Sequence, residues 1–304
     1  MIATGEYELL TEAVGLVDRS ARGKLELRGT EAAEFLQGQV TNDVESLAPG
    51  EGCYAALLNH KGKIRTDLRV LRGDDWLWLD AEPTGMRALT HTIETYSLGR
   101  EVRWEDLGGA RAILSLIGPG ARDALDAAPP EREHAFVHGE HGLYVATDLG
   151  VDLICDAADG DAVRAALGVE AVSEEALECL RIEAGRPRLG LDMDGDTLPQ
   201  EAGLNDRAVD FEKGCYVGQE TVARLHYKGK PNRHLRGLRL SAPAATGDPI
   251  ALGERQVGTI GSVCDSPRLG PIALALIRRE AEPGTTVLVG NESAEVVELP
   301  FPSS

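Results

Sequence analysis

The division of this chain is decided by RHLRGLRLSAPAATGDPIALGERQVGTIGSVCDSPRLGPIALALIRREAEPGTTVLVGNESAEVVELP, residues 233–300. Short β-prone runs follow one another at close spacing with many turns, which is typical of a small barrel or sandwich. Before Pro231 the sequence mixes short helices with short strands instead. The 304 residues are long enough for two or three cores. We therefore predict an α+β region over residues 1–230 and an all-β domain over residues 231–304.

Several segments of the α+β region have a clear periodicity. Residues 54–72, YAALLNHKGKIRTDLRVLR, read as two strands around a tight turn, and residues 83–99 have the apolar face of a helix. SEEALECLRIEAG, residues 173–185, predicts a helix capped by Ser173. RAILSLIGPGARDALDAA, residues 111–128, predicts a strand, a Gly-Pro-Gly turn and a helix.

The charge balance narrows the classes of partner. Asp and Glu number 50 against 31 Lys and Arg, which gives a formal net charge of −19. Such a surface repels nucleic acid and anionic membranes, so we expect neither as a partner. Many carboxylates with few lysines suit a halophile with an acidic proteome and a salt-rich cytoplasm, where screening removes the self-repulsion.

Cysteine usage and hydropathy indicate a cytoplasmic protein. The five cysteines are scattered, odd in number and without a CxxC pair, so we expect neither a disulfide framework nor a metal site built on them. No apolar run approaches the ~20 residues needed to span a bilayer, and the first residues lack the features of an export signal.

The octapeptide KGCYVGQE, residues 213–220, is the most unusual stretch of the chain. The following GQETVARL predicts a helix start. A nearby lysine and a helix N-terminus both favour thiolate over thiol, so Cys215 is a candidate functional thiol. The alternative is a buried structural cysteine, which we prefer for the other four cysteines. The residues of this signature are Lys213, Gly214, Cys215, Tyr216, Gly218, Gln219 and Glu220.

Two acids are further candidates. Asp67 lies in an apolar and basic strand, where an inward carboxylate would need a partner or a ligand donor. Strand alternation equally allows Asp67 to face solvent. Glu201 lies on a loop in LPQEAGL, residues 198–204, and could be a ligand carboxylate or simply solvated.

Two other motifs carry less chemistry. His134, His138 and His141 lie within eight residues, but Gly139 argues against a helix that would align them, so we expect solvated imidazoles rather than a metal site. The Gly-Pro-Gly turn at residues 118–120 lacks the spacing of a phosphate-binding loop, which excludes the usual nucleotide motifs.

The signature KGCYVGQE resembles that of the YgfZ-type folate-binding proteins, relatives of the T-protein (aminomethyltransferase) of the glycine cleavage system. The resemblance covers essentially the whole chain, because other segments follow in the order seen in that superfamily. They are GLVDRS (15–20), GTEAAEFLQGQVTNDV (29–44), LLNHKGKIRTDLRV (57–70), LIGPGARDAL (116–125), RIEAGRPRLGLDM (181–193), LPQEAGL (198–204) and KGKPNRHLRGL (228–238).

The resemblance implies a fold and a cofactor. The fold would have two α+β parts with ferredoxin-like lobes and a C-terminal β-barrel, arranged as a three-lobed ring. Tetrahydrofolate, or a one-carbon derivative of it, would lie in the central channel.

The resemblance also implies roles for single residues. Asp67 aligns with the acid that T-proteins place near N5 of the folate, where a carboxylate can hold a proton. Glu201 aligns with the acid that accepts the N–H and NH2 edge of the pterin. Lys230 falls where T-proteins have an arginine for the anionic side of the substrate, and Arg233 is a nearby alternative.

Asn59 and Tyr54 are expected to line the same channel. Cys215 is a feature of YgfZ-type proteins that T-proteins generally lack, whereas Asp67 and Glu201 are features of T-proteins. The resemblance thus leaves three hypotheses for the function.

The first hypothesis is a YgfZ-type accessory factor that binds tetrahydrofolate and supports assembly or repair of iron–sulfur clusters in client proteins. The second is an aminomethyltransferase, or a related folate-dependent one-carbon transferase, that takes its one-carbon unit from a lipoyl carrier protein. The third is a folate-binding module without chemistry. The signature octapeptide favours the first, and whether the chain is an enzyme stays open at this point.

Overall fold

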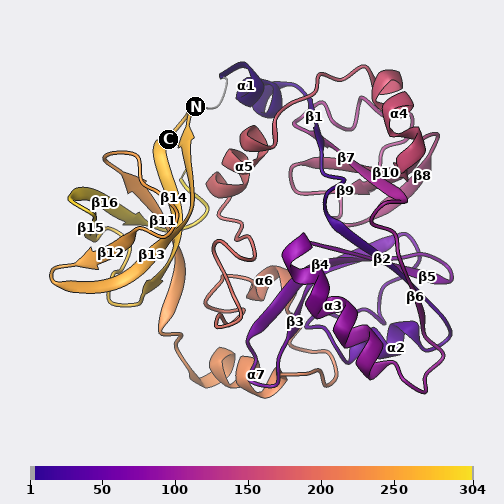
Figure 1. The fold of residues 1–304 in the computed structure, drawn as a ribbon, viewed down its shortest axis with the longest axis horizontal. Coiled ribbons are helices and arrows are strands. Elements are labelled where there is room, and N and C mark those ends of the chain that lie inside the picture. The colour runs from indigo at the N-terminus through magenta and orange to yellow at the C-terminus, as the bar shows by residue number, and fades with distance from the viewer. Residues whose placement is uncertain (1–3, 303–304) are drawn as a thin grey trace.

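The computed structural model describes residues 4–302 and shows three lobes, two built on five-stranded sheets and one a closed barrel (Figure 1). This confirms the predicted α+β class with a C-terminal β-barrel. The barrel, in orange and yellow, stands apart from the two sheets, and α5 (Glu174–Glu183) lies between them and the barrel.

The first sheet is antiparallel and carries its helices on one face. Alternate residues of its strands, such as Leu68 and Val70, pack on α2 (Ala32–Gln37) and α3 (Pro83–Tyr96) in one apolar core. In spatial order its strands are β3 (Glu51–Leu58), β4 (Ile64–Arg72), β5 (Trp76–Ala81), β2 (Gly23–Arg28) and β6 (Arg103–Asp106).

The second sheet is also antiparallel and is covered by short helices. Its core includes Leu114, Tyr144 and Leu153, together with Val163 of α4 (Gly160–Leu167). A 3-10 turn, Ala157–Asp159, precedes α4. Its strands, in spatial order, are β1 (Gly15–Asp18), β7 (Arg111–Ile117), β10 (Gly150–Asp156), β9 (Gly142–Ala146) and β8 (Phe136–Gly139).

The two sheets face each other across a shared apolar cluster. Leu71 and Trp78 of the first sheet pack there with Ile113, Phe136 and Ile154 of the second. The chain crosses from one sheet to the other between β1 and β2, since β1 pairs with β7 whereas β2 pairs with β5 and β6. The turn at residues 19–22 therefore lies at the junction of the sheets.

The barrel closes through pairing of its first and last strands. Its apolar interior includes Leu238, Ile260 and Val296. In spatial order its strands are β11 (Arg233–Leu240), β14 (Gly270–Arg278), β13 (Arg255–Ser266), β12 (Pro249–Leu252), β15 (Thr286–Val289) and β16 (Glu292–Val297).

A buried carboxylate ties the barrel to the rest of the chain. Glu183, at the end of α5, accepts hydrogen bonds from Tyr7 of α1 (Thr4–Glu12) at 2.9 Å, and from Ser266 and Arg268 of the barrel at 2.5 and 2.8 Å. The short α6 (Asn205–Ala208) and α7 (Gln219–Lys228) complete the connection from α5 to the barrel. No helix in residues 4–302 is long and apolar enough to cross a membrane.

Two local predictions need correction. The helix predicted after the Gly-Pro-Gly turn is wrong, because residues 119–127 form turns and bends. A segment this short nucleates poorly before Pro129, and Asp126 instead accepts the Tyr144 hydroxyl at 2.6 Å. Ser173 does occupy the N-cap position of α5, but its hydroxyl donates to Glu6 at 2.5 Å and not to the helix.

Candidate functional site between the two sheets

Strand alternation on β4 turns charged residues toward the second sheet. Leu68 and Val70 enter the core beneath α2 and α3, so Asp67, Arg69 and Leu71 lie on the opposite face. Asp67 is 8% exposed and Arg69 is 6% exposed. The structure thus decides the alternative that alternation left open: Asp67 points inward.

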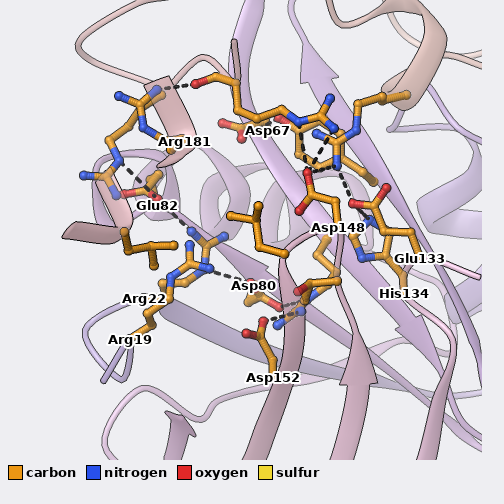
Figure 2. Close-up of a pocket in the computed structure, with 18 of the residues that line it drawn as sticks. Arg19, Arg22, Asp67, Asp80, Glu82, Glu133, His134, Asp148, Asp152 and Arg181 are labelled. Atoms are coloured by element: carbon orange, nitrogen blue, oxygen red, sulfur yellow. Dashed lines mark hydrogen bonds and ion pairs between the residues drawn. The ribbon is translucent and has the colours of Figure 1, made fainter. Parts of the chain in front are cut away.

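Asp67 and Arg69 line a cavity of about 180 Å³ between the sheets (Figure 2). Residues 177, 178 and 181 of α5 and the segment 186–188 close one side of it. The lining is strongly charged but balanced. Seven arginines (Arg19, Arg22, Arg69, Arg181, Arg186, Arg188 and Arg207) face seven acids (Asp67, Asp80, Glu82, Glu133, Asp148, Asp152 and Glu178).

Asp67 is an acid of this pocket with one buried oxygen that has neither a hydrogen bond nor an ion pair within residues 4–302. The Tyr54 hydroxyl donates to Oδ2 at 2.8 Å, whereas Oδ1 is buried without a hydrogen-bond partner. Burial raises the pKa of Asp67, while the Tyr54 hydrogen bond and the Arg22 charge act in the opposite direction. The Arg207 guanidinium lies 5.3 Å from the centre of the Tyr54 ring. Tyr54 and Asp67 therefore form one wall of the pocket.

A buried ion network forms the floor and joins the two sheets. Arg69 donates to Asp80 of β5 at 2.7 Å and to Asp152 of β10 at 2.6 Å. Arg22 donates to the second Asp80 oxygen at 2.9 Å. Burial opposes the ionisation of Asp80, but Arg69 and Arg22 outweigh it and hold its pKa well below the usual range. The sequence patterns did not predict this network, although Arg69 and Asp80 stand out as charges in otherwise apolar strands.

His134 is another residue of the pocket that the sequence patterns did not predict. We expected it to be solvated, but its side chain is only 12% exposed and lines the pocket. It lies in the turn before β8 with a φ of +68°. Desolvation, assisted by the charges of Arg69 and Arg207, lowers its pKa to about 3, so the imidazole is neutral. Residues 4–302 contain no group of three His, Cys, Asp or Glu side chains placed to hold a metal ion.

The signature segment lies outside this pocket and is held by its own contacts. Lys213 donates to the carbonyl oxygens of Gln37, Val40 and Asn42 at 2.7, 2.7 and 2.8 Å. Its ammonium is thus bound to backbone oxygens, which differs from the role beside the thiol that we expected. Cys215 is exposed, whereas Tyr216 is buried.

The second glycine of the signature, Gly218, is required by its backbone conformation and by close packing. It occupies the N-cap position of α7 with a φ of +86°, and a Cβ there would lie 2.5 Å from the carbonyl oxygen of Asn59. Asn59 in turn caps the β3–β4 turn, since its Oδ1 accepts the backbone N–H groups of Lys61 and Lys63 at 2.9 and 3.1 Å. The motif therefore packs on the hairpin turn and leaves the Cys215 thiol at the surface.

Glu201 and Arg233 lie against each other. Arg233 donates to both carboxylate oxygens at 3.1 and 3.0 Å, and the Leu198 N–H donates to one of them at 3.1 Å. The exposed Lys230 lies in a separate surface hollow along the barrel. Of the candidates from the sequence, Asp67 and Tyr54 line the central pocket; Asn59, Glu201, Cys215, Lys230 and Arg233 are not among its lining residues.

Comparisons with known proteins agree with this architecture. Residues 2–142 match the GCVT N-terminal domain, and residues 233–301 match the glycine cleavage T-protein C-terminal barrel domain. The aminomethyltransferase of Synechococcus sp. (strain WH7803) is 30% identical over 97% of this chain and 89% of that protein. The aminomethyltransferase of Staphylococcus carnosus (strain TM300) is 27% identical over 93% and 84% of the two chains.

A solved structure shares the whole fold. The glycine cleavage system aminomethyltransferase T from Bartonella henselae superposes with a TM-score of 0.87 at 26% identity, over 98% of this chain and 89% of that one. The two sheets, the barrel and the pocket between the sheets thus define a T-protein fold. This chain belongs to the glycine cleavage T-protein superfamily.

Proposed function

We propose that this chain is a folate-dependent aminomethyltransferase, or a closely related one-carbon transferase, with tetrahydrofolate bound in the central pocket. Its similarity to aminomethyltransferases over nearly the whole chain supports this reading. The observation that carries it is Asp67, a buried acid with one free oxygen on the wall of that pocket.

The Asp67 carboxyl has the setting of a proton carrier. Its raised pKa brings protonation closer to neutral pH, where a general acid or base works best. Tyr54 fixes the carboxyl by donating to Oδ2, so Oδ1 is the atom left to hold or receive a proton. Bound tetrahydrofolate would supply the amine that accepts the one-carbon unit.

The remaining pocket suits a reduced folate. Buried polar atoms without hydrogen-bond partners gather around it, including Oδ1 of Asp67 and Oγ1 of Thr147, and a polar ring system could satisfy them. Arg19 has no ion pair among residues 4–302 and is available for a carboxylate of the ligand.

The family resemblance gives Glu201 the role of holding the pterin edge, but Glu201 does not line the central pocket and both of its carboxylate oxygens accept hydrogen bonds from Arg233. With the pterin bound in the central pocket, Glu201 is therefore not a ligand contact in this proposal, and its carboxylate orients Arg233 of the barrel instead.

A second function is favoured by one observation. The signature holds Cys215 at the surface, where a thiol can meet another protein. In this reading the chain is a YgfZ-type factor that supports iron–sulfur clusters in client proteins of the cytoplasm. The two functions differ in partner, a lipoyl carrier protein for the transferase and an iron–sulfur protein for the factor.

The test is formation of methylenetetrahydrofolate from an aminomethyl-loaded lipoyl carrier protein. We expect the wild-type chain and Cys215→Ser to be active and Asp67→Asn to be inactive. No product from the wild-type chain, together with loss of iron–sulfur enzyme activity in cells carrying only Cys215→Ser, would favour the accessory factor instead.

A further inference from the structure

His134 is the one non-glycine residue with a positive φ among residues 4–302. A side chain makes this left-handed conformation unfavourable, whereas glycine adopts it readily. Backbone hydrogen bonds hold the turn in place: the His134 N–H donates to Ala146 O and the Phe136 N–H donates to Gly50 O, both at 2.8 Å. A sequence selected for stability alone would place glycine here.

The imidazole of His134 is buried without satisfying its own hydrogen bonds. Neither ring nitrogen has a partner, and both are shielded from solvent. The carboxylate of Glu133 lies 3.4 Å from Nε2 without hydrogen-bond geometry. A neutral imidazole has one donor and one acceptor, so burying both unpaired is unfavourable. His134 thus destabilises the fold in two ways, through its left-handed backbone conformation and through its unpaired ring nitrogens.

Both features are located at the central pocket. Glu133, the neighbour of His134 in the chain, pairs with Arg207, whose guanidinium lies over the Tyr54 ring, and Tyr54 donates to Asp67. His134 and the candidate proton carrier therefore both line this pocket (Figure 2). Seven described residues have buried side-chain atoms without hydrogen-bond partners. Five of them line this pocket, namely Asp67, Arg69, His134, Thr147 and Glu178. Unpaired polar atoms gathered at one cavity indicate a polar ligand.

We propose that His134 is a ligand-binding residue of the central pocket, where its imidazole hydrogen-bonds a neutral edge of the ligand, either a heterocycle or an amide. The neighbouring Arg69 and Arg207 keep the ring uncharged, so it offers one donor and one acceptor together. The assignment rests on the proposed function for the identity of the ligand, a reduced folate.

Replacement by glycine separates binding from folding. His134→Gly removes the ring and relieves the left-handed strain, so the unfolding midpoint should stay the same or rise. Loss of the hydrogen bond should weaken binding of 5-formyltetrahydrofolate about three- to tenfold by calorimetric titration. His134→Asn, which tolerates a positive φ but has a shorter side chain, should also bind more weakly. The matched control is His138→Asn, because His138 is exposed and outside the pocket.

Nitrogen-detected NMR of the histidine rings of the wild-type chain gives a readout that a structural residue would not move. The signal that disappears in His134→Asn should show a neutral ring at pH 6, and it should shift when 5-formyltetrahydrofolate is added.

Wild-type affinity in both His134 variants, with an unshifted ring signal, would overturn this inference and leave the proposed function intact. Failure of the wild-type chain to bind the folate would overturn the proposed function, and the assignment of His134 as a folate contact with it.

Discussion

Arg69 of β4 and Asp152 of β10 form an ion pair across the two sheets, with 2.6 Å between Arg69 NH1 and Asp152 Oδ2. The Ser115 hydroxyl donates to the other oxygen of Asp152 at 2.6 Å, and Asp80 pairs with the same guanidinium. The pair holds the two sheets together at the floor of the pocket. Apolar side chains packed at this position would instead fill the space that a polar ligand needs.

Removing the arginine should therefore be costly. Arg69→Met leaves Asp80 and Asp152 buried without their shared cation, and we expect the free energy of unfolding to fall by about 3–5 kcal/mol. Urea unfolding measures this loss. Arg72→Met, on the same strand, is the control, because the half-buried Arg72 side chain donates to the carbonyls of Val44 and Glu45 and forms no ion pair within residues 4–302. Equal stability of the two variants would contradict the role given to Arg69.

Asp67→Asn should separate catalysis from stability. The amide keeps the shape of the carboxyl but cannot exchange a proton, so the rate of methylenetetrahydrofolate formation should fall about 100-fold or more. The free energy of unfolding should hold or rise slightly, because a buried carboxylate with one unpaired oxygen is itself unfavourable. Asp74→Asn, on an exposed turn, serves as the control. A full rate in Asp67→Asn would remove Asp67 from the mechanism.

Lowering the pH should reduce the free energy of unfolding, because His134 takes up a proton more readily in the unfolded chain. Its pKa is about 3 in the folded chain against an ordinary value of 6.5, so between these values the unfolded chain binds a proton that the folded chain does not. Stability due to this group is complete above about pH 6.5 and is lost as the pH falls toward 3. At pH 5 the loss is about 2 kcal/mol relative to pH 7.5.

The groups around the ring set this shift. Burial and the charges of Arg69 and Arg207 disfavour the imidazolium, and Asp80 and Asp152 oppose them only in part. Urea unfolding of the wild-type chain and His134→Asn at pH 5.0 and 7.5 checks the prediction, since the variant should lack the increment. Parallel pH dependence in the two proteins would show that His134 is protonated in the folded state.

Two residues of the signature should differ in their roles: Lys213 should stabilise the fold, and Cys215 should be an accessible thiol. Lys213→Met removes the donor from three carbonyl oxygens and should cost about 2–3 kcal/mol of unfolding free energy, whereas Cys215→Ser should change it little. A thiol reagent should modify Cys215 rapidly in the folded chain while Cys53, Cys155 and Cys179 stay protected by burial. A rapid reaction that persists in Cys215→Ser would contradict this.

The fold could be predicted from local patterns to a large extent. The closely spaced β-prone runs after Pro231 indicate the barrel, and the hairpin of β3 and β4 follows from alternation around Asn59 to Gly62. The segment at residues 119–128 shows the limit of such patterns. Its composition favours a helix, but Asp126 is bound by Tyr144 of β9, a contact made only in the folded chain.

The site could be predicted only in part. Asp67 stands out because it is an acid in an apolar strand, but the partners that define its environment come from distant segments. Arg22 lies where the chain crosses between the sheets, and Arg207 comes from α6. His134 carries no local signal, because its significance lies in a backbone conformation and a burial that only the assembled sheets impose.

The central claim is that a reduced folate binds between the two sheets with its reactive end at Asp67. A crystal structure of the chain with 5-formyltetrahydrofolate tests it most directly. We predict the ring system in the pocket bounded by Tyr54, Asp67 and His134, with a polar atom of the ligand within hydrogen-bond distance of Asp67 Oδ1. A folate bound at the barrel surface or beside Cys215, with the pocket unchanged, would contradict the account.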